Sequence, residues 1–182
     1  MPERNYADAG TQLPLGVRDD RKGIRAMTND EIRGMTLEKN KARQPKILVF
    51  ACKWCGLIGA DGAGRKKLEL PVDFRVIPVE CAGFVEPDAI IRALASGIDG
   101  VVVMGCHIGG CRFNNANHQA IKRLELLKEL LDATGIGKER LMISFGTAHE
   151  DHQFADIIKD YFRKISGSIR LEPWVESYVP KR

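Results

Sequence analysis

The sequence predicts an α/β domain built on an open, mostly parallel sheet of about four strands with flanking helices. From Lys46 onward, short apolar runs rich in β-forming residues alternate with amphipathic segments of helical spacing, a pattern typical of doubly wound parallel sheets. The chain has 182 residues, of which 44% are hydrophobic and 29% charged, which fits one globular domain and excludes wholesale disorder. We therefore expect one domain of the Rossmann or flavodoxin-like type over residues 45–168.

Four segments have the length and composition of strands. Residues 47–52 form the first apolar run, and residues 75–81 form the second. Pro78 lies inside the second run, and because proline cannot donate a ladder hydrogen bond, it favours an edge position. Residues 100–106 read as a buried strand, and residues 141–145 as a fourth.

Three helices are expected between and after these strands. Residues 87–96 form the first, and residues 115–133 form the second, with leucines at helical spacing. Thr147 and Glu150 have the spacing of a capping box that opens the third. The glycine-rich connection 53–74 is expected to be a long loop, which is unusual in such folds.

Both ends of the chain differ from this pattern. Residues 1–44 are polar and form an expected N-terminal arm, in which a capping box predicts a short helix over residues 29–35. Residues 169–182 form an expected C-terminal tail with two aromatic side chains, Trp174 and Tyr178. The arm is interpreted equally well as a docking segment or as a mobile extension. The tail is interpreted equally well as a docking segment or as a segment that folds back on the domain.

Charge and hydropathy exclude two classes of partner. Lys and Arg number 28 and Asp and Glu number 24, so the net charge of +4 is small and evenly spread, which argues against nucleic acid. The sequence has neither the apolar segment of a signal peptide nor a run long enough to span a membrane. We expect a cytoplasmic protein.

Five cysteines are concentrated in one 60-residue stretch. Structural disulfides are uncommon in the cytosol and an odd number fits a disulfide framework poorly, so metal binding or thiol chemistry is favoured. The five residues are Cys52, Cys55, Cys81, Cys106 and Cys111.

The predicted strands give these cysteines a common location. Cys52, Cys81 and Cys106 each end one strand, and the carboxyl ends of parallel strands share one edge, where ligands bind. Cys55 and Cys111 lie in the loops that follow, so all five thiols are expected to converge. Four thiolates suit either an iron–sulfur cluster or zinc.

Glycines beside these cysteines favour a redox cluster over zinc, because backbone N–H groups can then approach sulfur closely. A zinc-stabilised interaction module stays open as an alternative. So does a thiol enzyme in which Cys106 or Cys111 acts as nucleophile near His107. Trp54 is expected to shield the site or to touch a partner.

Several segments together resemble a known family over roughly residues 46–166. The family is that of the delta, iron–sulfur subunit of methyl-viologen-reducing nickel–iron hydrogenase. The resemblance is carried by Cys52-Lys53-Trp54-Cys55, Gly59-Ala60-Asp61, Val79-Glu80-Cys81-Ala82-Gly83, Gly97-Ile98-Asp99-Gly100-Val101, Gly105-Cys106-His107-Ile108-Gly109-Gly110-Cys111 and Lys122-Arg123.

This resemblance implies an electron-transfer subunit with a 2Fe-2S cluster and no substrate chemistry of its own. Four of the five cysteines would ligate iron, and which four is left open. Such a subunit would link a hydrogenase or formate dehydrogenase module to the flavin-containing A component of heterodisulfide reductase.

The last cysteine loop departs from the family pattern at two positions. Where the family usually has proline and an acidic residue, this chain has Ile108 and Gly110. Loss of an acidic side chain beside a cluster favours the more negative reduced state, so we expect a higher reduction potential than in the typical relative. The arm lies outside the resemblance, which leaves the partner open.

Overall fold

The computed structural model describes residues 17–19, 23–25, 43–146, 150–168, 170, 171 and 173. The chain divides into two compact units, residues 1–39 and residues 40–182. In the first unit, β1 (Val17–Asp19) pairs antiparallel with β2 (Gly23–Arg25). The helix expected over residues 29–35 and the aromatic residues Trp174 and Tyr178 lie outside the described residues.

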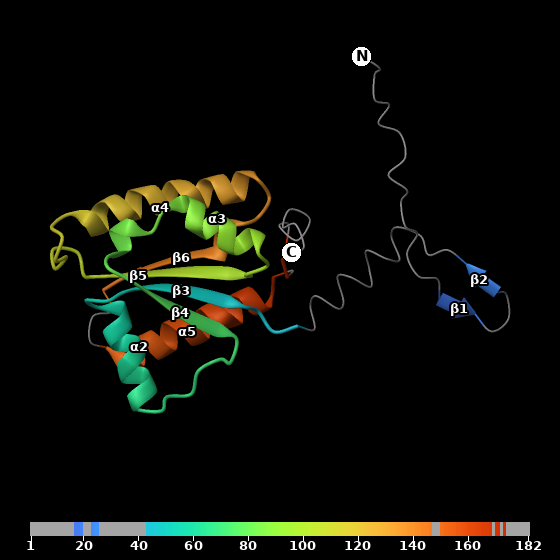
Figure 1. Ribbon diagram of the computed structural model, residues 1–182, viewed down its shortest axis with the longest axis horizontal. Helices are drawn as coiled ribbons and strands as arrows, with labels where there is room; N and C mark the ends of the chain where they lie inside the picture. Colours follow the sequence, from blue (N-terminus) through green and yellow to red (C-terminus); the bar gives the residue numbers. More distant parts are fainter. Residues whose placement is uncertain are drawn as a thin grey trace, which may run out of the picture. The chain divides into compact units, whose positions relative to one another are not determined.

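The second unit is an α/β fold around an all-parallel sheet of four strands, in the order β4-β3-β5-β6 (Figure 1). This confirms the predicted fold class. The strands are β3 (Ile47–Cys52), β4 (Phe74–Val79), β5 (Gly100–Gly105) and β6 (Leu141–Phe145). The strand that contains Pro78 lies at an edge, as expected for a residue without a backbone donor.

Helices cover both faces of this sheet (Figure 1). Helices α2 (Gly56–Arg65) and α5 (Asp151–Ser166) lie on one face, and α3 (Pro87–Ala95) and α4 (Ala116–Ala133) lie on the other. Two short 3-10 turns, η1 (Ala82–Phe84) and η2 (Lys138–Arg140), follow β4 and precede β6.

Strand β5 lies at the centre of the core and is buried along its whole length. Its side chains alternate between the faces, as a strand requires. Val101 and Val103 belong to the apolar cluster that contains Leu124 of α4. Val102 and Met104 belong to the cluster on the other face, which includes side chains of α5.

Helix α2 corrects the expectation of a long loop over residues 53–74. Its ten residues include four glycines, which lowers intrinsic helix propensity. One of these glycines permits close packing between helices: a Cβ atom on Gly62 would lie 3.0 Å from the Cβ of Asp151 in α5. Tertiary packing therefore decides this segment rather than propensity.

Helix α5 begins later than the capping box predicts. Its first residue is Asp151, and Glu150 occupies the N-cap without a side-chain cap hydrogen bond. Thr147, the expected cap, lies outside the described residues. The helix itself is present, and its N-cap is Glu150 rather than the expected Thr147.

The amino-terminal edge of the sheet is tied together by a buried carboxylate, that of Asp99, just before β5. Its oxygens accept hydrogen bonds from the guanidinium of Arg43, the backbone N–H of Lys46 and the backbone N–H of Leu171. These donors precede β3 and follow α5. Both ends of the domain are thus anchored on one residue, at the edge opposite the cysteines.

Candidate metal centre

Three cysteines lie at or just after the carboxyl ends of β3 and β5. Cys52 is the last residue of β3, and Cys106 directly follows β5. Cys55 is the N-cap of α2, reached by a tight turn in which its N–H donates to the Cys52 carbonyl at 3.1 Å. The partial positive charge of the helix start therefore lies beside these sulfurs, where it stabilises thiolates.

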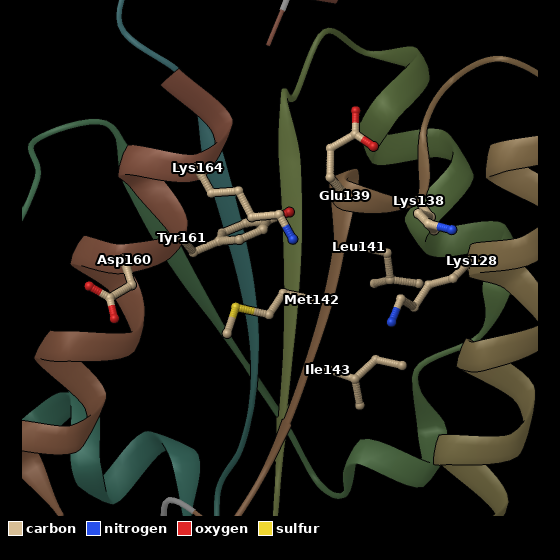
Figure 2. A pocket seen from close by; sticks show the side chains of 9 residues that line it. All are labelled: Lys128, Lys138, Glu139, Leu141, Met142, Ile143, Asp160, Tyr161 and Lys164. Carbon is tan, nitrogen blue, oxygen red and sulfur yellow. The ribbon is translucent and has the colours of Figure 1, made fainter. Parts of the chain in front are cut away.

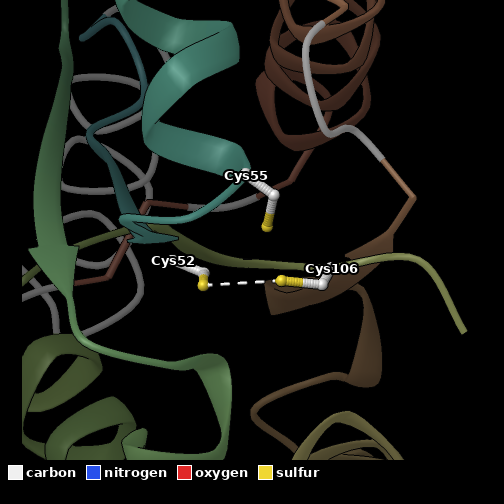
Figure 3. Close-up of side chains that lie close together, drawn as sticks. All are labelled: Cys52, Cys55 and Cys106. Carbon is white, nitrogen blue, oxygen red and sulfur yellow. Dashed lines mark hydrogen bonds between the residues drawn. The ribbon is translucent and has the colours of Figure 1, made fainter. Parts of the chain in front are cut away.

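The sulfur atoms of Cys52, Cys55 and Cys106 all lie within 4.8 Å of one another, and all three residues are buried (Figure 3). The Cys52 and Cys106 sulfurs are 3.8 Å apart. Three soft ligands held this closely away from water are able to bind a metal ion.

The other two thiols lie next to this group. Cys111 is half-buried and packs against the three cysteines. Cys81, the N-cap of η1, is buried, and its sulfur accepts a hydrogen bond of 3.3 Å from the backbone N–H of Gly83. Cys81 is not among the three mutually close thiols, although both Cys111 and Cys52 influence its protonation.

Protonation of the thiols reflects their mutual contact. The hydrogen bond from the Cys55 thiol lowers the pKa of Cys52 to about 5, against the opposing effect of burial. The same contact with Cys52, together with burial, raises the pKa of Cys55 well above its ordinary range. Burial is the main cause that raises the pKa of Cys81 to about 11 and also raises the pKa of Cys106. A metal ion that bound Cys55 or Cys106 would therefore displace a proton from that thiol, and the same would hold for Cys81 if Cys81 were a ligand.

Two residues of α4 position the cysteine loops, and sequence reasoning assigned neither of them a role. The buried Asn117 side chain donates to the His107 carbonyl at 2.9 Å. Arg123 donates to the carbonyls of Gly83 and Val85 at 2.7 and 2.9 Å, which fixes the η1 turn after Cys81. A polar residue in the first turn of a helix that follows a cysteine loop was the available signal for Asn117.

Trp54, between Cys52 and Cys55, is stacked on its neighbours and still 37% exposed. The Arg112 guanidinium lies 4.0 Å from the centre of its ring, and the Lys53 ammonium lies 5.3 Å from it. Trp54 therefore links the loop after β3 to the loop after β5 and leaves part of its surface free.

A nucleophile–base pair at His107 finds no support in the hydrogen bonds of the described residues. None of them joins the His107 ring to a thiol, and the residue is exposed. The His107 carbonyl accepts hydrogen bonds from the Asn117 side chain and from the backbone N–H of Gly110, and both contacts position the backbone.

A separate cavity of about 570 Å³ lies along the free edge of β6, between α4 and α5 (Figure 2). No cysteine lines it. Its walls combine apolar strand residues with lysines and acids: Lys128, Lys138, Glu139, Leu141, Met142, Ile143, Asp160, Tyr161 and Lys164. The thiol site and this cavity are different features of the molecule.

A parallel sheet with buried, mutually close thiols at its carboxyl edge defines an α/β protein with a thiol site able to hold a metal ion. No helix among the described residues is long and apolar enough to cross a membrane. Residues 47–167 match the FlpD family, the delta subunit of methyl-viologen-reducing hydrogenase, and the chain belongs to that family.

Similar proteins carry hydrogenase and reductase names. The chain is 38% identical over 118 residues to the iron-sulfur D subunit of the F420-non-reducing hydrogenase from Archaeoglobus profundus, covering 65% of this chain and 86% of that protein. It is 39% identical over 124 residues to the vhc iron-sulfur D subunit of the F420-non-reducing hydrogenase from Methanococcus voltae, covering 68% and 86%.

A third relative is a larger protein, from Methanosarcina acetivorans. It is the A component of the ferredoxin/F420H2-dependent CoB-CoM heterodisulfide reductase, and it is 32% identical over 161 residues, which cover 86% of this chain and 20% of that protein. Residues 47–182 alone make up less than 86% of this chain. The similarity to this relative therefore also includes part of the first 46 residues.

Proposed function

We propose that the chain is a non-catalytic electron-transfer subunit that holds one 2Fe-2S cluster on four of its five cysteines. The cluster would relay electrons between a hydrogenase- or formate-dehydrogenase-type module and a flavin-containing partner of the heterodisulfide reductase A type. The observation that carries the proposal is the group of three buried, mutually close thiols in a member of this family.

The donor set suits this cofactor. Cys52, Cys55 and Cys106 supply three ligands from rigid positions at strand ends and at a helix start. Cys81 and Cys111 lie next to them in loops, and either can supply the fourth ligand. The names of the relatives, iron–sulfur subunits, favour a cluster over the alternative of zinc.

When bound, a cluster of this type accepts and releases single electrons. The protein's own contribution is to hold the thiolates, exclude water and place partial positive charge near them. Burial of the three thiols excludes water, and the start of α2 and the N–H of Gly83 provide positive charge. Asn117 and Arg123 keep the loops that carry Cys106 and Cys81 in place.

The partner assignment draws on the two kinds of relative. The hydrogenase relatives match the α/β domain, whereas the heterodisulfide reductase relative also matches part of the arm. We assign residues 45–168 to the iron–sulfur domain, and residues 1–44 and 169–182 to an arm and a tail outside it, in a cytoplasmic complex.

Anaerobic purification of the full chain tests the cofactor. We expect broad absorbance between about 400 and 500 nm that bleaches with dithionite, and about two irons and two sulfides per chain. A colourless chain with one zinc would replace the proposal with the zinc module. Metal-free protein with alkylation-sensitive activity would replace it with the thiol enzyme.

A further inference from the structure

Exposed large apolar side chains gather on the loops that carry the cysteines. Each loop after β3, β4 and β5 contributes at least one, and it is their grouping on these loops, rather than the exposure of any single side chain, that is informative. They are Trp54, Phe84, Ile108 and Phe113. Together with Arg112 they are called here the loop-tip surface.

Contacts between these side chains join the three loops at their tips. The rings of Phe84 and Phe113 meet edge to face, with their centres 6.2 Å apart. Arg112, next to Phe113 in the chain, stacks on Trp54. Trp54, Arg112, Phe113 and Phe84 are therefore joined across three separate loops, and these loops follow the strand ends at the edge of the sheet where the thiols lie.

Arg112 is held in place and has its charge available. Its guanidinium is exposed and stacked on the Trp54 ring, and no acidic side chain pairs with it among the residues that the structure describes. Lys53, whose ammonium also lies near the ring, already pairs with Glu80. A stacked guanidinium has lost part of its rotamer freedom and still offers a planar set of donors to a carboxylate.

We propose that the loop-tip surface docks the protein that exchanges electrons with this chain, and that the docked surface is apolar at its centre and presents a carboxylate to Arg112. Aromatic and arginine side chains are the residues that most often dominate binding energy in protein interfaces. The location beside the thiols lets the same contact bring the partner's redox group near the cluster.

This inference deepens the proposed function, because the need for an electron partner comes from the cluster. The side chains of the loop-tip surface indicate what kind of protein surface binds there. The exposed apolar side chains call for a complementary apolar surface, and the guanidinium stacked on Trp54, unpaired among the residues described, calls for an acidic group.

Substitutions in the native complex test the proposal. The full chain, tagged and expressed in its source organism, carries Phe84→Ser or Arg112→Glu. Phe84 is 67% exposed, so its replacement leaves the core intact. We expect the amount of partner proteins recovered per chain to fall about tenfold or more, while iron per chain stays unchanged.

Matched controls lie on other surfaces. Leu126→Ser on α4 changes an apolar side chain of similar exposure, 63%. Lys164→Glu on α5 reverses an exposed cation that lines the β6 cavity. Recovery should change by less than about twofold for both controls. Equal losses for the controls and the loop-tip variants would overturn the proposal.

Hydrogen exchange on the unmodified chain supplies a test that needs no variant. Peptides over residues 53–55, 82–86 and 107–113 should exchange more slowly in the complex than in the free chain. Protection confined to other peptides, such as those of β6, would overturn the docking site. A chain that docks through this surface and contains no iron would overturn the proposed function and leave the docking site standing.

Discussion

Gly56 of α2 and Met104 of β5 are packed so closely that a Cβ atom on Gly56 would lie 2.8 Å from the Cβ of Met104. Real Cβ atoms do not approach this closely, so only glycine fits between the helix start and the strand. Because Cys55 directly precedes Gly56, this contact sets how near the Cys55 sulfur comes to Cys52 and Cys106.

Replacing Gly56 by alanine should displace the first turn of α2 and with it the Cys55 ligand. We expect iron per chain to fall by about half or more, with the fold retained, as checked by iron analysis and circular dichroism. Gly64→Ala in the same helix is the control, since a Cβ there meets nothing within 4 Å. It should keep full iron and stabilise the chain by up to about 1 kcal/mol. Full iron in Gly56→Ala would contradict the argument.

Single Cys→Ser changes should separate the five thiols into two classes. Serine at Cys52, Cys55 or Cys106 removes one of three mutually close ligands, so visible absorbance and sulfide should be lost. Of Cys81 and Cys111, one should be dispensable, and its variant should keep about two irons per chain. Retention of the cluster in Cys55→Ser, or its loss in all five variants, would refute this division.

Strand and helix order could be predicted from the sequence because long apolar runs and helical periodicity are local signals. The strand over residues 141–145 was found with its correct ends. The cysteine edge followed from topology alone, since every parallel strand ends on the same side. Helix α2 was missed because two of its four glycines, Gly56 and Gly62, are explained by contacts with Met104 and Asp151, which no local pattern reveals.

The site was predictable in position and not in detail. The sequence indicated that all five thiols lie at the carboxyl edge of the sheet. The distances between their sulfur atoms depend on the conformations of the loops, which side-chain contacts determine. Arg112 is an example: it lies far from Trp54 in sequence, and only the structure shows the stack that joins their loops. The roles of Asn117 and Arg123 were likewise hidden, because each acts on backbone carbonyls of another segment.

Asp99→Asn should weaken the anchoring of both ends of the domain. The fully buried carboxylate accepts from Arg43 at 3.0 Å and from two backbone N–H groups, so loss of its charge leaves these donors poorly satisfied. We expect a loss of about 2 to 4 kcal/mol in the free energy of unfolding, measured by denaturant titration.

Asp88→Asn is the matched control for Asp99. It removes an exposed carboxylate that pairs with Arg92 one helical turn away. Such surface pairs contribute little, so the loss should stay below about 0.5 kcal/mol. A similar effect of the two substitutions would show that burial of Asp99 does not matter to stability.

Acid should remove the tie between α2 and α5. Lys66 lies 2.7 Å from Asp151, and the hydrogen bond from Lys66 is the main cause that lowers the pKa of that carboxyl. A lowered pKa in the folded state stabilises the fold above the ordinary carboxyl pKa of about 4, and the contribution is lost as the pH falls.

The difference in melting temperature between the unmodified chain and Lys66→Met, measured from pH 7 to pH 3, checks this sign. The unmodified chain should melt higher at pH 7, and the difference should shrink toward pH 3. Arg65→Met, which removes an exposed pair with Asp61, serves as control. A difference that grows on acidification would contradict the assignment.

Gly110→Asp should make the reduction potential of the bound cluster more negative. Gly110 is exposed in the loop before Cys111, and a Cβ there meets only ordinary contacts with His107, the nearest at 3.6 Å, so aspartate fits without strain. A carboxylate at this position opposes the added negative charge of the reduced state. Gly110→Asn has nearly the same shape without the charge and should leave the potential close to that of the unmodified chain. Redox titration of the three proteins, followed by visible absorbance, decides the matter. An unchanged or higher potential in Gly110→Asp would show that the absence of an acidic residue at position 110 does not raise the reduction potential of this chain.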